Sequence, residues 1–145
     1  MAMAIETVAT NPVDRWLGRG FAFPMVPAAE PGDPPERTHL RLIGGMELVR
    51  QAVTTILDTE PGERVMAPTF GCGLRRHLSA PNTVATRTAM RQEVSEALAQ
   101  WEPRIRVTDV TVSPGEEQSL VYIDIAFVRL ADLRPDNLVY PFYLS

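Results

Sequence analysis

Residues Leu120-Val-Tyr-Ile-Asp-Ile-Ala-Phe-Val-Arg-Leu130 carry the strongest strand pattern of the chain. Apolar side chains recur there at every second position, which is the period of a β-strand. One face of the expected strand carries Val121, Ile123, Ile125 and Phe127. The opposite face, with Tyr122, Ala126 and Val128, is also mostly apolar, so we expect both faces to be covered.

Two further strands are expected on either side of this one. The preceding strand carries Ile105, Val107, Val110 and Val112, and its alternation breaks at Thr108-Asp109, which predicts a β-bulge. Residues 113–119 then form the turn. The chain ends in an apolar strand, residues 137–144, that contains Pro141. Because proline cannot donate a ladder hydrogen bond, this last strand is expected at an edge of the sheet.

Helical periodicity dominates the middle of the chain. Apolar residues between 48 and 57 recur at steps of three and four, which predicts a helix from about Gly45 to Asp58. A second helix is expected from an N-cap at Asn82 to about Trp101, where Pro103 ends it. Between the helices we expect a short strand at 63–66 and a structured loop at 67–74. The fold class is therefore α+β, with two main helices packed on a small, mainly antiparallel sheet.

The 145 residues fit one folded domain, expected over 18–145 and preceded by an N-terminal arm at 1–17. Residues 27–37 contain four prolines and are expected to form an extended loop. Charges are spread along the chain around a net −4, and no basic block of the kind that binds nucleic acid is present. No secretory signal or membrane-spanning stretch is evident, so we expect no membrane insertion.

Chemistry-bearing residues give weak signals. Cys72 is the only cysteine and the two histidines are far apart, so neither a disulfide nor a metal site is expected, and no cofactor. Cys72 and His77 could be a thiol and its base, but a small buried thiol is the simpler interpretation. Acidic pairs for glycoside hydrolysis can be drawn from Glu60, Glu63, Glu102 and Asp109, as in any chain with 18 acids. A small-molecule binding domain is a further alternative, although no polar groups converge in the sequence.

Glu102-Pro103-Arg104 is more informative. The proline fixes the exit from the second helix, so the two charged residues lie at a rigid corner. The corner is either a helix stop flanked by solvated charges or a preorganised charged contact for a partner protein. On either interpretation Arg104 is expected at the surface, where its truncation would cost the fold little.

Five segments in order carry a family resemblance: residues 18–24 (Gly-Arg-Gly-Phe-Ala-Phe-Pro), 56–66 (Ile-Leu-Asp-Thr-Glu-Pro-Gly-Glu-Arg-Val-Met), 68–74 (Pro-Thr-Phe-Gly-Cys-Gly-Leu), 101–105 (Trp-Glu-Pro-Arg-Ile) and 137–144. In this pattern the chain resembles the baseplate wedge family of contractile tails, which includes the lysozyme-like baseplate protein of phages and the TssE-like sheath initiator of type VI secretion. The arm, the proline-rich loop and Thr69, where an acidic residue is usual, depart from the pattern.

The resemblance implies a structural subunit that binds the wedge core bundle and nucleates the tail sheath by strand addition. The bundle contact falls on Glu102, Pro103 and Arg104. The sheath-binding strands, which resemble the interlocking (handshake) strands of the sheath itself, carry Val121, Ile123, Ile125, Phe127, Leu138, Val139, Tyr140, Phe142 and Tyr143.

Further expectations follow from the same resemblance. The partners would be the wedge proteins and the first sheath ring, with tube or hub proteins nearby and six copies in each baseplate. The subunit would be assembled in the bacterial cytoplasm and would end in the baseplate of a phage tail or injection particle. The alternative function is a peptidoglycan-hydrolysing lysozyme-like enzyme of the tail.

Overall fold

The computed structural model describes residues 12, 14–25, 27–28 and 39–144. Most of the expected N-terminal arm and most of the proline-rich loop lie outside these residues. The chain divides into two compact units, Met1–Gln51 and Ala52–Ser145, which we describe separately. The single domain expected over 18–145 stays a prediction.

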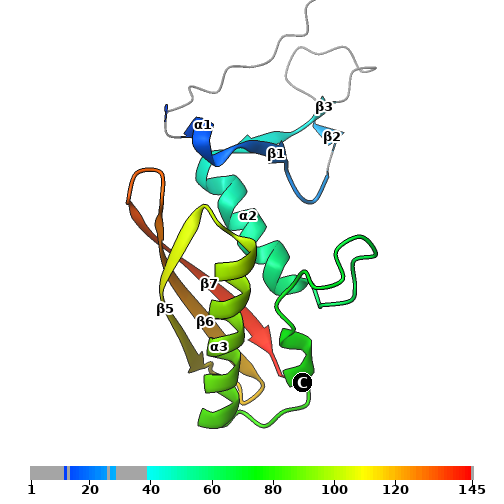
Figure 1. Cartoon of the computed structure of the whole chain (residues 1–145). Helices are drawn as coiled ribbons and strands as arrows, with labels where there is room; N and C mark the ends of the chain where they lie inside the picture. Colours follow the sequence, from blue (N-terminus) through cyan, green and yellow to red (C-terminus); the bar gives the residue numbers. More distant parts are fainter. Residues whose placement is uncertain (1–11, 13, 26, 29–38, 145) are drawn as a thin grey trace, which may run out of the picture. The chain divides into compact units, whose positions relative to one another are not determined.

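The first unit contains two small hairpin-like sheets (Figure 1). Helix α1 (Asp14–Leu17) leads into strand β1 (Arg19–Phe21), which pairs antiparallel with β4 (Leu42–Gly44). Strand β2 (Pro27–Ala28) pairs antiparallel with β3 (His39–Leu40). The Gln51 side chain donates to the Phe21 carbonyl and accepts from the Phe23 N–H, and so ties this region to helix α2.

Helix α2 (Gly45–Asp58) has the expected bounds, and the division between the two units falls within it. Gly45 begins the helix with a φ of +60°, and a β-carbon there would lie 2.8 Å from the Asp14 carboxylate. Glycine is therefore required at this position. Four side chains of the helix are buried: Val49, Val53, Ile56 and Leu57.

The second unit is built on a three-stranded antiparallel sheet of order β5-β6-β7. Its strands are β5 (Ile105–Pro114), β6 (Leu120–Arg129) and β7 (Pro135–Tyr143). The register shifts between Val107 and Asp109, so the predicted bulge is confirmed. The four expected core residues of β6 are all completely buried. The other face of β6 is only partly covered, since Tyr122 is 37% exposed, and the expectation of full cover was wrong there.

Helix α3 (Val84–Trp101) packs against the sheet beside β5 (Figure 1). Its N-cap is Thr83 and not Asn82, because the Thr83 hydroxyl accepts from the Thr86 N–H. Asn82 instead donates to the Gln118 carbonyl and accepts from Arg87, which links the helix start to the β5–β6 turn. The inward side of the helix holds Met90, Val94, Ala97 and Leu98. An α+β fold with small antiparallel sheets, as predicted, is confirmed.

A turn-rich segment and a short 3₁₀ helix, η1 (Leu74–His77), connect α2 to α3. The short strand expected at 63–66 is absent: these residues form turns and bends. The sequence there is apolar at Val65 and Met66, but both side chains project into solvent, at 93% and 95% exposure. The apolar pattern therefore marks an exposed loop end and not a strand.

Candidate partner-docking site

The corner at Glu102 and Arg104 is an internal ion pair. Glu102 caps the C-terminus of α3, and its side chain is only 3% exposed. Arg104 donates through Nε to Glu102 Oε1 at 2.6 Å and through Nη2 to Oε2 at 2.5 Å, which is a bidentate pair. This pairing raises the pKa of the Arg104 guanidinium. Arg104 is therefore held in one orientation by a carboxylate that faces the protein interior.

Backbone hydrogen bonds fix the same corner. The Glu102 N–H donates to the Leu98 carbonyl, and the Leu130 N–H donates to the Arg104 carbonyl at 3.0 Å. Arg104 keeps 27% of its side chain exposed, whereas Pro103 between the two charged residues is exposed. Arg104 therefore lies only partly at the surface, and its guanidinium neutralises a buried carboxylate. The small cost expected for its truncation stays a prediction, and this pairing argues against it.

The structure separates the residues predicted to bind sheath into two groups. Strand β6 is central and pairs with a strand on each side, and its Val121, Ile123, Ile125 and Phe127 are fully buried in the core. Neither its backbone edges nor these side chains are available in the folded unit. Strand β7 is an outer strand, and it alternates between the core and the surface. Leu138, Tyr140 and Phe142 face inward, while Val139 and Tyr143 are about half exposed.

Tyr140 anchors β7 to the end of α2. Its hydroxyl donates to the Asp58 carboxylate, 82 residues away in sequence. Partial burial and this carboxylate together raise the pKa of Tyr140 above its ordinary value. The bond holds the outer strand in place in the folded unit.

The loop between α2 and η1 is held by a dense set of hydrogen bonds. At its base the Cys72 N–H donates to the Thr59 carbonyl, and further out the Gly62 N–H donates to the Pro68 carbonyl at 2.6 Å. The Glu60 carboxylate accepts from the Arg75 N–H. The backbone is thus fixed on both sides of the exposed Val65-Met66 end.

An aromatic stack connects this loop to α3. The Arg64 guanidinium carbon lies 4.1 Å above the centre of the Phe70 ring. The Phe70 ring in turn lies 5.3 Å from that of Trp101, tilted by 56°. Trp101 is the residue before Glu102, so the loop and the corner are neighbours. The sequence interpretation missed this stack, although all its residues lie in the segments that carry the family resemblance.

Cys72 and His77 do not form a nucleophile and base. Burial, with Glu93 and Glu60 nearby, raises the pKa of the Cys72 thiol to about 12. The His77 Nε2 is bonded to the Glu93 carboxylate at 2.9 Å. A protonated, buried thiol is a poor nucleophile.

Each carboxylate considered for catalysis is already engaged within the chain. Glu60 accepts from the Arg75 N–H, Glu63 from the Glu60 N–H, Glu102 from Arg104, and Asp109 from Arg91. Nowhere in the described ranges do three or more His, Cys, Asp or Glu side chains gather as they would around a metal ion. Within those ranges, too, no helix has both the length and the apolar character needed to span a bilayer.

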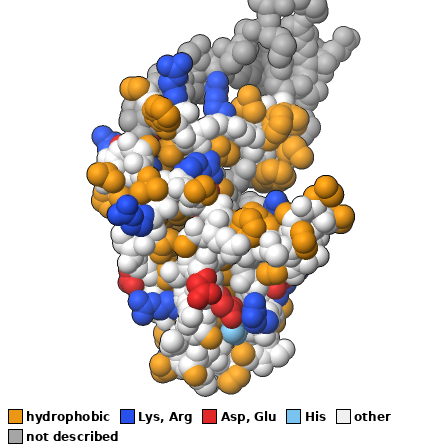
Figure 2. All heavy atoms as spheres, in the orientation of Figure 1, with side chains coloured by type: hydrophobic (Ala, Val, Ile, Leu, Met, Phe, Trp, Pro, Cys, Tyr) orange, Lys and Arg blue, Asp and Glu red, His pale blue; other side chains and the backbone are white. Residues whose placement is uncertain are grey.

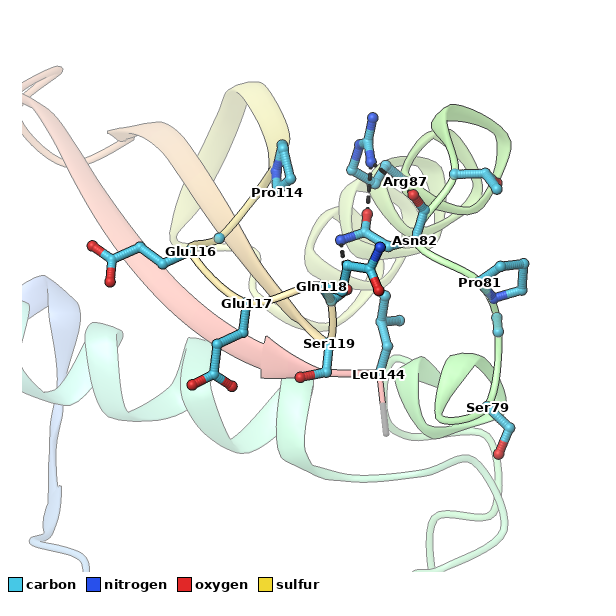
Figure 3. Close-up of a pocket in the computed structure, with 13 residues that line it drawn as sticks. Ser79, Pro81, Asn82, Arg87, Pro114, Glu116, Glu117, Gln118, Ser119 and Leu144 are labelled. Atoms are coloured by element: carbon cyan, nitrogen blue, oxygen red, sulfur yellow. Dashed lines mark hydrogen bonds between the residues drawn. The ribbon is translucent and has the colours of Figure 1, made fainter.

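One cavity of the second unit is an open groove of about 840 Å³ at the β5–β6 turn (Figure 3). Its charged groups diverge: Glu116 and Glu117 point away from Arg87, which is held by Asn82. A smaller hollow of about 460 Å³ lies between α3 and the 59–73 loop. The groove at the β5–β6 turn therefore lacks the converging polar groups typical of a small-molecule site.

Comparison with known proteins identifies the family. Residues 44–132 match the family described as baseplate wedge protein gp25, which is more than half of the chain. The chain belongs to the baseplate wedge protein gp25 family. It is therefore a structural baseplate component of a phage tail or contractile injection system, as the resemblance implied. The family match covers α2, the 59–73 loop, the corner and β5–β6 but not β7.

Individual relatives support the assignment. The baseplate wedge protein gp25 of Enterobacteria phage T4 is 28% identical over 94 residues, which is 65% of this chain and 70% of that protein. A Geobacter sulfurreducens crystal structure, provisionally called a tail lysozyme, is 40% identical with a TM-score of 0.64, covering 69% of this chain and 91% of its own. A chain of the anti-feeding prophage baseplate is 22% identical with a TM-score of 0.63, covering 93% and 92% respectively, and shares the fold.

Proposed function

We propose that this subunit docks onto the wedge core bundle through the Glu102-Pro103-Arg104 corner and nucleates the first sheath ring at the open edge of β7. The observation that carries the proposal is that β7 is one of the two outer strands of the sheet and holds Pro141 within its ladder. Its partners would be other baseplate proteins and sheath, with tube or hub proteins nearby. Six copies would serve one sixfold baseplate, assembled in the bacterial cytoplasm.

Strand addition is supported by Pro141, which lies within β7 without interrupting it. Pro141 is in register with Tyr122, and the ladder continues on both sides as far as Tyr143 and Pro135. A strand tolerates proline where the missing N–H would point away from the neighbouring strand. Successive residues of a strand point their N–H groups to alternate sides, so residues 139 and 143 share the outward side with Pro141. These groups are the donors that an incoming sheath strand would use.

The corner supplies a preorganised cation to the bundle. Glu102 is too buried to reach a partner, so its role is to position Arg104. Arg104 and the exposed Pro103 form the part of the corner that a partner can touch. Of the three residues expected to contact the bundle, Pro103 and Arg104 thus remain as contact residues, and Glu102 becomes a positioning residue.

A structural role without enzymatic activity is the better-supported function. The second candidate, a peptidoglycan hydrolase, is favoured by the lysozyme name of the Geobacter structure. Against it, the four carboxylates considered above, Glu60, Glu63, Glu102 and Asp109, are bonded within the chain, and a retaining or inverting glycosidase requires two that flank one substrate bond. Clearing of a peptidoglycan suspension by the purified wild-type chain, lost in Glu63→Gln, would support the hydrolase instead.

The proposed function is tested by separating docking from sheath growth. Val139→Pro removes one outward N–H of β7 and should leave the subunit in purified baseplates while sheath fails to polymerise on them. Tyr140→Pro, one residue on, removes an N–H directed toward β6 and should destabilise the fold. Normal sheath on baseplates that contain Val139→Pro would refute strand addition.

A further inference from the structure

Most of the 59–73 loop projects from the second unit, and the proposed function gives it no role. We call residues 60–71 of this loop the finger. Figure 2 shows apolar side chains gathered at its outer end, where Val65 and Met66 are the most exposed large apolar residues that the structure describes. Large apolar side chains held this far out in a monomer mark contact sites when they are rigidly presented.

Hydrogen bonds and a tight backbone closure hold the finger rigid. Besides the bonds at its base and middle, the Glu63 N–H donates to the Glu60 carbonyl and the Glu63 carboxylate accepts from the Glu60 N–H. Gly71 adopts a φ of +123°, and a β-carbon there would lie 2.1 Å from the Thr59 carbonyl oxygen. The tight closure at Gly71 therefore depends on the absence of a side chain. A preorganised loop loses little entropy when a partner covers it.

A positive charge accompanies the apolar end. Arg64 precedes Val65 and stacks on Phe70, and within the described ranges it forms no ion pair. The neighbouring acids do not neutralise it, because Glu60 is bonded to the Arg75 N–H and Glu63 lies 3.7 Å from the Arg75 guanidinium. The finger thus presents two apolar side chains beside a guanidinium that is free to pair with a carboxylate.

We propose that the Arg64-Val65-Met66 end of the finger inserts into an apolar pocket with a carboxylate at its rim on a neighbouring baseplate protein. The pocket takes the two apolar side chains, and the rim carboxylate pairs with Arg64. The finger is continuous with the Arg104 corner through the Phe70–Trp101 stack, so both belong to one docking surface. This inference rests on the proposed function, because the finger can make this contact only if the subunit lies in a baseplate.

Methionine oxidation provides a direct test. Dilute hydrogen peroxide converts an accessible methionine to its sulfoxide, and mass spectrometry of peptides reports each site. In the isolated chain Met66, at 95% exposure, should oxidise fast and the fully buried Met90 slowly. In purified baseplates that contain the subunit, the Met66 rate should fall at least about tenfold. An unchanged Met66 rate in the baseplate overturns the proposal.

Variants test the same contact by competition. A Val65→Ala/Met66→Ala chain and an Arg64→Glu chain, each co-expressed with wild type, should be under-represented in baseplates by about tenfold or more. Matched controls are Val84→Ala, a truncation at an exposed apolar residue of α3, and Arg106→Glu, a charge reversal at an exposed arginine of β5. Equal incorporation of finger and control variants, all folded by circular dichroism, contradicts the proposal.

Two further outcomes are distinguished by the same samples. If wild-type chain is absent from baseplates, the proposed function fails, whereas wild type present with reactive Met66 rejects only the finger contact. If Met66 of the isolated chain becomes protected as its concentration rises, the finger binds a second copy of the chain. That result overturns the assignment to a different baseplate protein.

Discussion

Replacing Arg104 by alanine should destabilise the second unit strongly. The change removes both charge-assisted hydrogen bonds from the Arg104 side chain to a carboxylate that is 3% exposed. It keeps the hydrogen bond from the backbone N–H of residue 104 to Glu102 Oε1, which is 3.3 Å long. Removing one partner of a buried pair costs about 3–5 kcal/mol. Because the Arg104 side chain is 27% exposed, water reaches the carboxylate in the variant, and we take the lower end, roughly 3 kcal/mol.

Urea denaturation followed by circular dichroism measures this loss as a lower midpoint at unchanged slope. In a thermal scan the same loss corresponds to a Tm lower by roughly 12–24 °C, at about 4–8 °C per kcal/mol for a unit of this size. The matched control is Arg91→Ala, since the Arg91–Asp109 pair is more than half exposed and should cost at most about 0.5–1 kcal/mol.

A double variant separates loss of the pair from loss of packing. In Glu102→Met/Arg104→Met both charges are replaced by apolar groups of similar length, which is often neutral or stabilising, so most of the stability should return. Equal midpoints for Arg104→Ala and Arg91→Ala would refute the inference that Arg104 neutralises a buried charge.

Three further predictions concern single positions. Gly71→Ala should lower the free energy of unfolding, measured in urea, by at least about 2 kcal/mol, because it adds a clash with Thr59 to an unfavourable φ. Gly62→Ala, with φ +92° but open space around it, should lower it by only about 1 kcal/mol. Equal losses in the two variants would contradict this reasoning. Since the pKa of Cys72 is raised to about 12, its alkylation by iodoacetamide at pH 8 should be on the order of a thousandfold slower in the native chain than in urea. The same shift lowers stability as pH rises from about 9 toward 12, because the unfolded thiol ionises first; a flat profile for wild type relative to Cys72→Ala would exclude it. Tyr140→Phe should lower the free energy of unfolding by about 1 kcal/mol through loss of the Asp58 bond, and an unchanged urea midpoint would show that the bond is not formed in solution.

Regular elements were predictable because their residues follow a single period. The β6 alternation, the bulge at Thr108-Asp109 and the α2 bounds all express local geometry that a sequence displays directly. The predicted N-cap of α3 was wrong by one residue. Asn82 and Thr83 are both good capping residues, and only the contact of Asn82 with Gln118 decides between them. The strand expected at 63–66 is absent because the apolar side chains of Val65 and Met66 lie on a turn-rich loop and are exposed, so their apolar character does not indicate burial.

The site was harder to predict because a charged residue is not always exposed, and the sequence alone does not show which charged side chains are buried in the fold. Glu102 and Arg104 look like two solvated charges beside a proline, and nothing in the sequence states that Glu102 faces inward. The pairing of Tyr140 with Asp58 spans 82 residues and has no local signature. Pro141 did indicate an edge strand, because the chemistry of proline excludes it from positions that must donate to a neighbour.

The order of the strands has a consequence for how the chain is made. Each strand of the β5-β6-β7 sheet pairs with the next along the chain, through short connections at 115–119 and 130–134. Loop closure is therefore inexpensive in entropy, and the sheet can grow in the order of synthesis. Until β7 leaves the ribosome, the outer edge of β6, with its fully apolar core side, has no neighbour. Chains that end before residue 135 should aggregate through β6, so β7 acts as a cover for the nascent sheet before it becomes the edge of the finished one.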